Sequence, residues 1–528
     1  MGRKTLIYHQ DTMSYRTIIL ALLVWACQMA TAQDLTGRVL HGNCIVSHDG
    51  QTRPTVTRAA ELGQQWDALR TYRQMVVLVS FSDRDFLEEN GPEAYNQIFN
   101  ESQYNRRNGP GCVADYFRQQ SNGRCNLQFD IFGPVKVSAV AKSGNGSYKY
   151  YGEKIFAEAM KQLATMYPNL DCSPYDWDGN GYIDQFIIVY AGYTGNLIGN
   201  SGYIWPNAWT MPEVTMPDGI KAKEYSASAE LWTGNISCGI GMICHEYSHC
   251  LGLPDVYPTV EEKWTLSIVD EWDLMDGGTI SNYGWCPPNY SPLEKIYLGW
   301  LEPIELTKDT IITGMKPVSE GGDVFMIKHT DNEYYLLENR TWQGWDAALP
   351  GKGLLVWHVN YDSYRWRANI INNEEGKPRY HLVTADNMDY DTWVDLYDSR
   401  GGGNPYQNKS MMNSYYLSSA AYPWITDSTD YVNQELTNSS VPAATMYNKN
   451  ADGSELLSKP ITNITVHEDG TISFVFHAST PDGMITPSAI SHQPSTIYTV
   501  TGRKVLPGEM NSLPKGIYII DGKKTFIK

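Results

Sequence analysis

The sequence predicts an α+β protein in which a mixed sheet packed with helices is followed by regions built from strands alone. Two dense apolar runs, Met75–Phe81 and Phe186–Tyr190, have the length and β-branching of buried strands. The segment Ser147–Tyr167 carries apolar residues at helical spacing, which favours a helix packed on that sheet. Beyond Leu301, short apolar runs alternate with turn signals, a pattern typical of all-β structure.

Length and composition limit the possible classes of protein. A chain of 528 residues exceeds one ordinary core, and its length favours about three domains. A hydrophobic content of 42% is ordinary for a globular protein. The net charge of -18 argues against nucleic acid as the main partner, because phosphate binding needs clustered Lys and Arg. The acidic excess instead favours solubility and cation sites.

The first residues have the pattern of an export signal. A basic residue precedes the apolar run Ile18–Ala26, and Ala30–Ala32 offers a small-x-small cleavage site, so residues 1–32 are predicted to be a signal peptide. The run is too short for a permanent bilayer span, so we expect no transmembrane segment in the mature chain. A competing interpretation is a lipoprotein signal acylated at Cys27, which the bulky Trp25 disfavours.

A run in the middle of the chain, GIGMICHEYSHCLGLPDVY, has the spacing of a metal site. Residues four apart share a helix face, so His245 and His249 can both point at one metal ion. Glu246 lies about 100° further round the helix, which suits a hydrogen bond to a metal-bound water. Gly252, followed closely by a proline, ends the helix, and Asp255 can then return as a third ligand. Three protein ligands with one open position are the pattern of a catalytic zinc.

A second element, WDLMDGG at Trp272–Gly278, follows at the distance that a methionine-containing turn beneath the metal requires. Taken alone, Met275 would be an ordinary core methionine. Together with the histidine motif, it is predicted to support the metal site from below.

The extended motif H-E-x-x-H-x-x-G-x-x-D resembles that of the immune-inhibitor-A family of secreted bacterial metallopeptidases, which belong with the metzincin-like enzymes. Other matching pieces are MVVLVSFSD, YDWDGNGYIDQFIIVYAG, IWP, WDLMDGG, LEKIYLGWL, YYLLENR and GWDAALPGKGLLVWHV, and they span roughly residues 75–360. The resemblance implies a metzincin-like zinc peptidase domain with His245, His249 and Asp255 as zinc ligands. It also implies protein or peptide substrates.

The implied reaction is peptide-bond hydrolysis in extracellular proteins. Zinc lowers the pKa of its bound water and polarises the scissile carbonyl, while Glu246 takes the proton and passes it to the leaving amine. Tyr283 is compatible with a role in stabilising the oxyanion, although the sequence does not place it. Two alternatives stay open: a catalytically inactive surface adhesin or glycan-binding protein on a metallopeptidase scaffold, and a zinc hydrolase of non-peptide substrates.

Residues 33–73 are polar, contain scattered arginines and show no clear period. We interpret them as a propeptide, as in a zymogen, or as an N-terminal brace. A thiolate at Cys44 is able to occupy the open zinc position and hold the enzyme latent. An ordinary structural cysteine is the simpler interpretation.

The segment DWDGNGYID predicts a second cation site. Asp176, Asp178, Asn180 and Asp184 stand at odd-numbered offsets, as in the first nine positions of an EF-hand calcium loop. Position twelve is Ile187 instead of the bidentate glutamate, which excludes an EF-hand regulator. The expected ion is calcium, and the alternative is an acidic turn without an ion.

After removal of the signal, eight cysteines remain, and an even number in an exported protein permits disulfides. Cys112 and Cys125 are the most plausible local pair. Cys244 and Cys250 flank the metal histidines, but we interpret them as packing residues and not as ligands.

The predicted domains follow in order. A zinc metallopeptidase domain at 74–310 is followed by a β-sandwich-like accessory region at 311–478 and a linker at 479–494. Residues 495–528 form a small β domain that resembles the C-terminal sorting domains of bacterial type IX secretion. This resemblance implies a secreted or outer-surface location and secretion machinery as a partner.

Overall fold

The computed structural model describes residues 66–144, 152–198, 200, 202–259, 268–374, 376–388, 417–425 and 432–479, and the backbone of four strands between 497 and 527. The chain forms two compact units, residues 1–479 and residues 480–528. The predicted signal peptide, Cys27, Cys44 and most of the predicted propeptide and linker lie outside the described residues. Within these described ranges, no helix combines the length and apolarity needed to cross a membrane.

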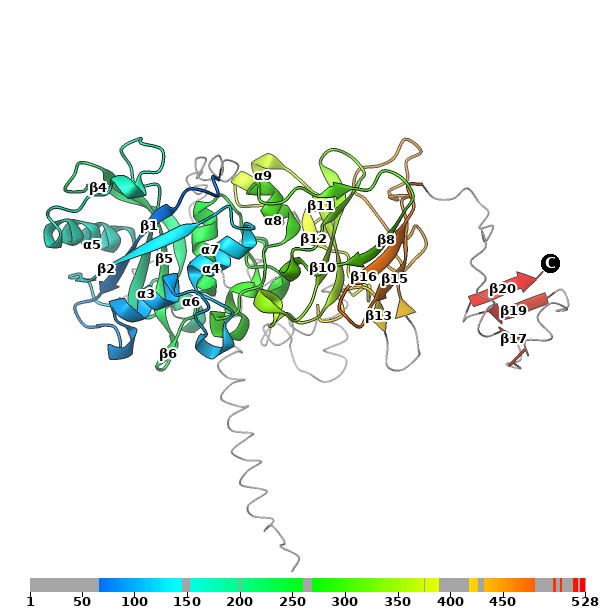
Figure 1. Cartoon of the computed structure of the whole chain (residues 1–528), viewed down its shortest axis with the longest axis horizontal. Helices are drawn as coiled ribbons and strands as arrows, with labels where there is room; N and C mark the ends of the chain where they lie inside the picture. The colour runs from blue at the N-terminus through cyan, green and yellow to red at the C-terminus, as the bar shows by residue number, and fades with distance from the viewer. Residues whose placement is uncertain are drawn as a thin grey trace, which may run out of the picture. The chain divides into compact units, whose positions relative to one another are not determined.

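A mixed six-stranded sheet forms the first half of the larger unit, with strand order β2-β1-β3-β5-β4 and β6 paired to β5 (Figure 1). Strands β1, β2, β3 and β5 run parallel, and β4 is the antiparallel edge strand. The strands are β1 Tyr72–Ser80, β2 Leu127–Lys136, β3 Phe186–Tyr193, β4 Asn207–Thr215, β5 Lys221–Thr233 and β6 Ile236–Ser237. The two strands predicted from apolar runs are β1 and β3.

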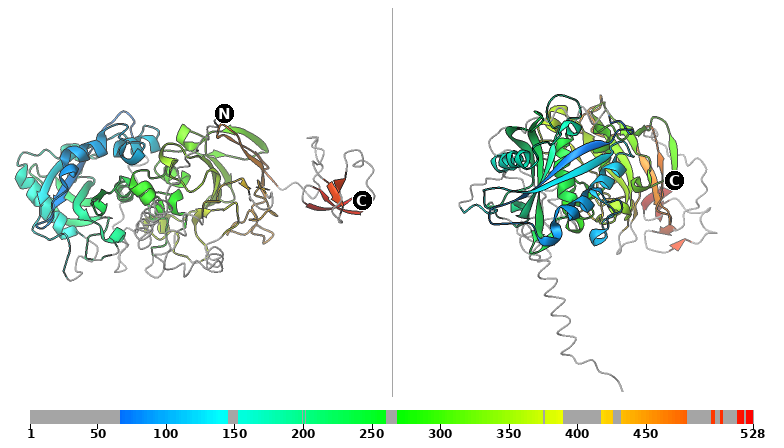
Figure 2. Two further views of the ribbon diagram at one scale, coloured as in Figure 1. Left: turned by 90° about the horizontal axis from the view of Figure 1, so that it is seen from below. Right: turned by 60° about the vertical axis from the view of Figure 1, so that its left-hand side comes forward.

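Helices cover both faces of this sheet (Figures 1 and 2). On β1, Val76 faces a cluster containing α7, whereas Val77 faces a cluster containing α5. Because both faces of β1 and β3 are buried, these two strands are nearly continuous apolar runs without alternation. The helices are α3 Pro92–Asn100, α4 Val113–Gln120, α5 Glu153–Met166, α6 Gly195–Ile198, α7 Gly241–Cys250, α8 Pro292–Tyr297 and α9 Ser363–Arg367. Short 3₁₀ turns are Glu88–Asn90, Arg106–Asn108, Ser173–Tyr175, Asp270–Trp272, Gly277–Gly284, Val318–Glu320 and Gly344–Asp346.

The second half of the larger unit is built mainly from strands, but it is not all-β as the sequence predicted, because α9 lies between β11 and β12. A five-stranded sheet has the order β12-β11-β10-β9-β7, a three-stranded sheet has the order β15-β16-β8, and β13 pairs with β14. The strands are β7 Ile304–Glu305, β8 Thr310–Met315, β9 Phe325–Lys328, β10 Glu333–Arg340, β11 Gly353–Asn360, β12 Tyr380–Leu382, β13 Trp424–Ile425, β14 Val432–Asn433, β15 Ile461–Val466 and β16 Ile472–Phe476. The chain is thus α+β with mixed sheets, as predicted.

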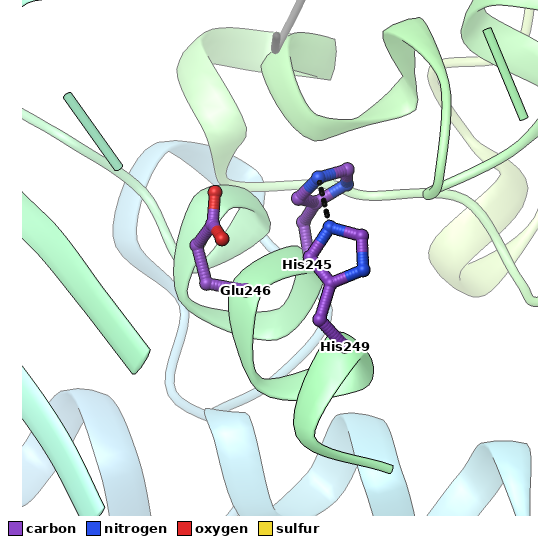
Figure 3. A group of neighbouring side chains, drawn as sticks. All are labelled: His245, Glu246 and His249. Carbon is purple, nitrogen blue, oxygen red and sulfur yellow. Dashed lines mark hydrogen bonds between the residues drawn. The ribbon is translucent and has the colours of Figure 1, made fainter. Parts of the chain in front are cut away.

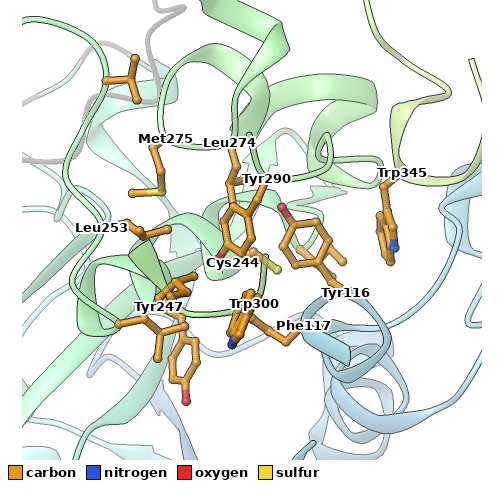
Figure 4. Close-up of a cluster of buried hydrophobic side chains, with 14 of the residues drawn as sticks. Tyr116, Phe117, Cys244, Tyr247, Leu253, Leu274, Met275, Tyr290, Trp300 and Trp345 are labelled. Atoms are coloured by element: carbon orange, nitrogen blue, oxygen red, sulfur yellow. The ribbon is translucent and has the colours of Figure 1, made fainter. Parts of the chain in front are cut away.

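Strand β10 is buried on both faces and joins the two halves. Tyr335 and Leu337 belong to a cluster shared with β15 and β16, whereas Leu336 belongs to the cluster that contains α4 and α7. Figure 4 shows part of this second cluster around Tyr247 and Met275. One hydrophobic core therefore contains residues from both sides of position 310. The predicted domain boundary at this position stays a prediction.

The smaller unit contains four strands in one antiparallel sheet of order β18-β17-β19-β20. Their bounds are β17 Ile497–Thr499, β18 Lys504–Val505, β19 Gly516–Ile520 and β20 Lys523–Ile527. The resemblance of this unit to a sorting domain stays a prediction.

The predicted disulfide between Cys112 and Cys125 is wrong, because both residues are free thiols, as are the other cysteines of the described part of the chain. The Cys112 sulfur caps α4 by accepting a hydrogen bond from the Asp115 amide at 3.3 Å, and burial raises the pKa of its thiol to about 11. Cys125 is fully buried in the core instead. The short separation of the two residues in sequence is compatible with a disulfide, but in the fold Cys112 caps a helix and Cys125 packs in the core.

The buried side chain of Arg340 forms ion pairs within the second half and a hydrogen bond to the segment before α8. The Arg340 guanidinium has Nε 3.0 Å from Glu338 Oε1 and Nη1 2.9 Å from Asp346 Oδ1, with all three side chains at most 1% exposed. Its Nη2 donates to the Asn289 carbonyl at 3.1 Å, in the segment that precedes α8. Removing one member of such a pair leaves a buried charge without compensation.

We therefore expect Arg340→Met to lower the free energy of unfolding by about 3–5 kcal/mol, measured by urea titration with tryptophan fluorescence. Lys136→Met is the matched control, because it breaks an ion pair to Asp85 whose side chains are 53% and 70% exposed. Such a surface pair contributes about 0–1 kcal/mol. Equal effects of the two substitutions would contradict the role given to Arg340.

Candidate metal centre

Helix α7, which carries the predicted metal residues, is buried along its whole length. Its start packs directly against the Gly277–Gly284 turn, and only glycine fits there. A Cβ on Gly241 would come within 2.0 Å of the Thr279 carbonyl oxygen, and one on Gly239 within 2.1 Å of the Gly284 backbone. The close approach fixes the helix against the turn that follows Met275.

The helix ends at the predicted glycine. Gly252 has φ +94°, its N–H donates to the His249 carbonyl at 3.0 Å, and the Leu253 N–H donates to the Ser248 carbonyl at 3.1 Å. This pair of bonds is a Schellman motif, in which a left-handed residue satisfies the last carbonyls of a helix. The chain reverses at this point and brings Asp255 back toward the helix.

The side chains of His245, His249 and Asp255 converge. The two Nε2 atoms lie 3.1 Å apart, and Asp255 Oδ1 lies 3.3 Å from His245 Nε2 and 3.2 Å from His249 Nε2. Figure 3 shows the two imidazoles turned toward one another. A tetrahedral zinc with ligand bonds of about 2.0–2.1 Å separates its ligand atoms by about 3.3–3.4 Å, so this donor set fits such an ion.

Backbone carbonyls fix both imidazoles. His245 Nδ1 lies 2.9 Å from the Leu274 carbonyl oxygen, and His249 Nδ1 lies 2.7 Å from the Leu253 carbonyl oxygen. A carbonyl only accepts hydrogen bonds, so each Nδ1 carries the proton and each neutral ring presents the Nε2 lone pair to its neighbours. This is the tautomer that a metal ligand requires.

The turn containing Met275 holds the site through its backbone. Met275 is fully buried, its N–H donates to Asp273 Oδ1 at 2.7 Å, and its carbonyl accepts from the Val256 N–H at 2.8 Å. Consecutive carbonyls of one turn thus orient His245 and the residue next to Asp255.

Buried carboxyl groups lie behind this turn. Burial raises the pKa of Asp273 to about 6. Burial, together with the Asp273 charge, raises the pKa of Glu294 well above its ordinary value. Glu294 Oε2 also accepts from the Ser291 N–H and hydroxyl at 2.8 Å, which forms the capping box of α8. Both carboxyl groups therefore hold a proton more tightly than an exposed acid does.

Glu246 is 1% exposed and follows His245 on the helix. Figure 3 shows its carboxylate on a different side of α7 from the imidazoles. One ligand-type atom from each of His245, Glu246 and His249 lies within 4.8 Å of the others. Burial lowers the pKa of His245, but the carboxylates of Asp255 and Glu246 raise it above its ordinary value overall. The site is thus a buried, negatively charged position that favours a cation.

The structure brings together three members of the second predicted site. Ligand-type oxygens of Asp176, Asp178 and Asp184 lie within 4.8 Å of one another. Asp176 also accepts N–H groups of its own loop, at 2.9 Å from Gly179 and 2.8 Å from Gly181. The fourth member, Asn180, directs Oδ1 to the Tyr182 N–H at 2.7 Å. This geometry suits both a cation loop and an acidic turn.

Tyr283 and Cys244, the other residues considered near the site, lie in different surroundings. Tyr283 is 39% exposed, with its ring 5.6 Å from that of Trp232 and the Arg107 guanidinium 4.8 Å from its ring centre. Cys244 is fully buried in the cluster of Figure 4. Burial raises the pKa of its thiol well above the ordinary value.

Sequence reasoning missed one residue of the site. Asn369 Nδ2 donates to Asp255 Oδ2 at 2.6 Å, and its Oδ1 accepts from the Asp255 N–H at 2.6 Å. The two residues are 114 positions apart. Neither the spacing nor the local motif around Asn369 signals a contact with the metal helix.

The amino-acid sequence is similar to those of known metallopeptidases. Residues 64–299 match the family described as immune inhibitor A peptidase M6, catalytic domain. Immune inhibitor A of Bacillus thuringiensis subsp. alesti is 24% identical over 47% of this chain and 43% of its own length. Pre-pro-metalloprotease PrtV of Vibrio cholerae serotype O1, strains M66-2 and ATCC 39315, is 24% identical over 44% of this chain and 29% of its own length.

The chain spans less than half the length of these curated relatives. The matched residues include α7 and all three converging side chains, His245, His249 and Asp255. The site and the comparisons together support a metallopeptidase, with residues 64–299 similar to the catalytic domain of the immune inhibitor A peptidases.

Proposed function

We propose that this protein is an exported zinc-dependent endopeptidase that hydrolyses peptide bonds in extracellular proteins, with Glu246 as the general base. The observation that carries the proposal is the triangle of His245, His249 and Asp255 ligand atoms, 3.1–3.3 Å on each side, with Glu246 on the same buried helix. On the same grounds we propose a metzincin-like arrangement, in which the sheet, the metal helix and the Met275 turn form one site.

The donor set favours zinc among the divalent ions. Two imidazole nitrogens and one carboxylate oxygen match its borderline preference, and three protein ligands leave one position open. Zinc, when bound there, would supply a Lewis acid that lowers the pKa of water and polarises a carbonyl group.

The chain's own residues carry the proton transfers. The Glu246 carboxylate would take a proton from the attacking water and deliver it to the amine nitrogen of the leaving peptide. Because Asp255 adds negative charge to the ligand set, more of the water activation falls on Glu246 than with three histidines. Glu246 lies on α7, whose residues are all buried, so the helix that carries the carboxylate is fixed by its packing.

Processing and location follow from the sequence pattern. We propose that residues 1–32 direct export and that residues 495–528 act with secretion machinery. We also propose that residues 33–73 act as a propeptide that keeps the enzyme inactive or as an N-terminal brace, with the end of this segment corrected to residue 71 because Tyr72 and Arg73 already belong to β1. The expected location is secreted or at the outer cell surface. The support is the apolar run and cleavage pattern at the start of the chain and the short strands at its end.

The principal alternative is a catalytically inactive adhesin or glycan-binding protein on this scaffold. Such a protein needs neither a general base nor a preserved ligand set, yet Glu246 and the three ligand groups are all present. The similarity to the metallopeptidase relatives also weighs against it.

Glu246→Gln should retain one zinc per chain and lose at least about 100-fold in casein hydrolysis, because the amide cannot accept the proton. His249→Ala should lose both zinc and activity. Zinc is counted by elemental analysis, and cleavage is followed with and without a chelator. Casein cleavage at the wild-type rate by Glu246→Gln would show that the assigned base is wrong. Zinc binding without any cleavage by the wild-type protein would favour the adhesin alternative.

We further propose that the loop containing Asp176, Asp178, Asn180 and Asp184 binds calcium. Three clustered carboxylates support a hard cation, and the remaining ligands would come from other oxygens, since Ca²⁺ takes six to eight.

Calcium should therefore raise the melting temperature of the wild-type protein. Saturation at about 100 times the dissociation constant stabilises the folded state by about 2.7 kcal/mol. Asp178→Asn should abolish most of this shift because it removes one anionic ligand. Asp171→Asn is the control, since Asp171 is a nearby exposed acid outside the loop. An identical calcium shift in wild type and Asp178→Asn would argue for an acidic turn without an ion.

A further inference from the structure

The side-chain amide of Asn369 contacts Asp255 twice. Its Nδ2 donates to Asp255 Oδ2 and its Oδ1 accepts from the Asp255 N–H, both at 2.6 Å. Asn369 is 4% exposed and Asp255 is fully buried, so little water competes for either bond. The other carboxylate oxygen, Oδ1, is the one that lies 3.2–3.3 Å from the two imidazole Nε2 atoms. The contact therefore decides which oxygen of Asp255 faces the histidines.

Asparagine suits this position for two physical reasons. It offers one donor and one acceptor on a single short side chain, whereas aspartate offers no donor when ionised. Asn369 also has φ +58°, in the left-handed region that asparagine tolerates better than most residues. A side chain of another type would lose a contact, strain the backbone, or both.

The segment around Asn369 is hydrogen-bonded to the loop that carries Asp255. Trp366 Nε1 donates to the Gly252 carbonyl at 3.1 Å, and the Thr259 hydroxyl donates to the Asn369 carbonyl at 2.6 Å. Asn372 Nδ2 donates to the Val256 carbonyl at 2.7 Å. The loop that follows the metal helix is thus attached along its length to residues from the β-rich half of the chain.

This segment is itself held in place at both ends. The Asp362 carboxylate caps α9 by accepting from the Tyr364 and Arg365 N–H groups at 3.0 Å. At the other end, Asn372 bonds Tyr380 of β12 twice, donating to its carbonyl at 2.9 Å and accepting from its N–H at 3.0 Å. The amide of Asn369 is therefore presented by a structure with little freedom to adjust.

We propose that Asn369 is a positioning residue for the metal: it orients Asp255 as a one-oxygen ligand and makes the β-rich half a structural component of the metal centre. The inference rests on the proposed zinc site. Asn369 lies outside residues 64–299, the region similar to the peptidase catalytic domain. Partners that orient metal ligands typically change metal affinity or activity about 10–100-fold when they are removed.

The test is zinc affinity of the full chain, measured without substrate by competition with a chromophoric chelator. Asn369→Asp keeps the side-chain shape and the acceptor, but it replaces the donor with a second carboxylate facing Asp255. We expect its zinc dissociation constant to rise about 10–100-fold. Asn369→Gly tolerates the positive φ and removes both contacts without adding charge, so it serves if the aspartate variant does not fold.

Two control variants distinguish a loss of Asp255 orientation from a general loss of stability in the loop that carries Asp255. Asn387→Asp changes an exposed asparagine with φ +52° and should bind zinc like the wild-type protein. Asn373→Ala removes the side-chain bonds to Thr259 of the same loop, at 2.7 and 3.0 Å, without touching Asp255 or the Asn369 amide, and we expect it to lower the melting temperature more than the zinc affinity. The absorption spectrum of the cobalt-substituted protein, which reports ligand geometry, should change for both Asn369 variants and for neither control.

The outcomes distinguish this inference from the proposed function. Wild-type zinc affinity and an unchanged cobalt spectrum in both Asn369 variants would overturn the positioning role, whatever the activity. An equal loss of affinity in Asn373→Ala would also overturn it, because attachment of the loop would then be sufficient. If the Asn369 variants lose zinc while no protein substrate is cleaved by wild type, the inference stands and the proposed peptidase function fails.

Discussion

The structure depends on bringing two imidazoles and one carboxylate together inside the protein, away from water. Each of the three groups is at most 3% exposed, and each is oriented by a partner: Leu274 for His245, Leu253 for His249 and Asn369 for Asp255. Buried polar groups are tolerated only when their hydrogen bonds are satisfied. The turns around α7 therefore supply hydrogen-bond partners that the buried imidazoles need.

The need for these partners explains the arrangement around the helix. The Met275 turn supplies one carbonyl to His245 and another to Val256, and the glycines at the start of α7 allow the backbone to approach this region closely. On the other side, the β-rich half supplies Asn369 and shares the hydrophobic core through β10. His245 and Asp255 thus receive their orienting hydrogen bonds from both halves of the larger unit.

Local patterns in the sequence predicted most of the helix and its ligands. The four-residue spacing of His245 and His249 places both on one helix face in any α-helix, and Gly252 marks the end of that helix by its freedom to adopt positive φ. The buried strands β1 and β3 were also predictable, since strands covered on both faces need unbroken apolar runs. By contrast, Cys112 and Cys125 had a spacing suitable for a disulfide, yet Cys112 caps a helix.

The sequence by itself determined the α+β class and the position of the helix that carries His245, Glu246 and His249, because these depend on spacings of a few residues. Only the tertiary structure decided that Asn369 orients Asp255, that Arg340 holds two buried carboxylates, and that one core spans both halves. These contacts join residues brought together by the packing of whole sheets. A single sequence carries no local signal for such pairs, since each partner alone is an ordinary polar residue.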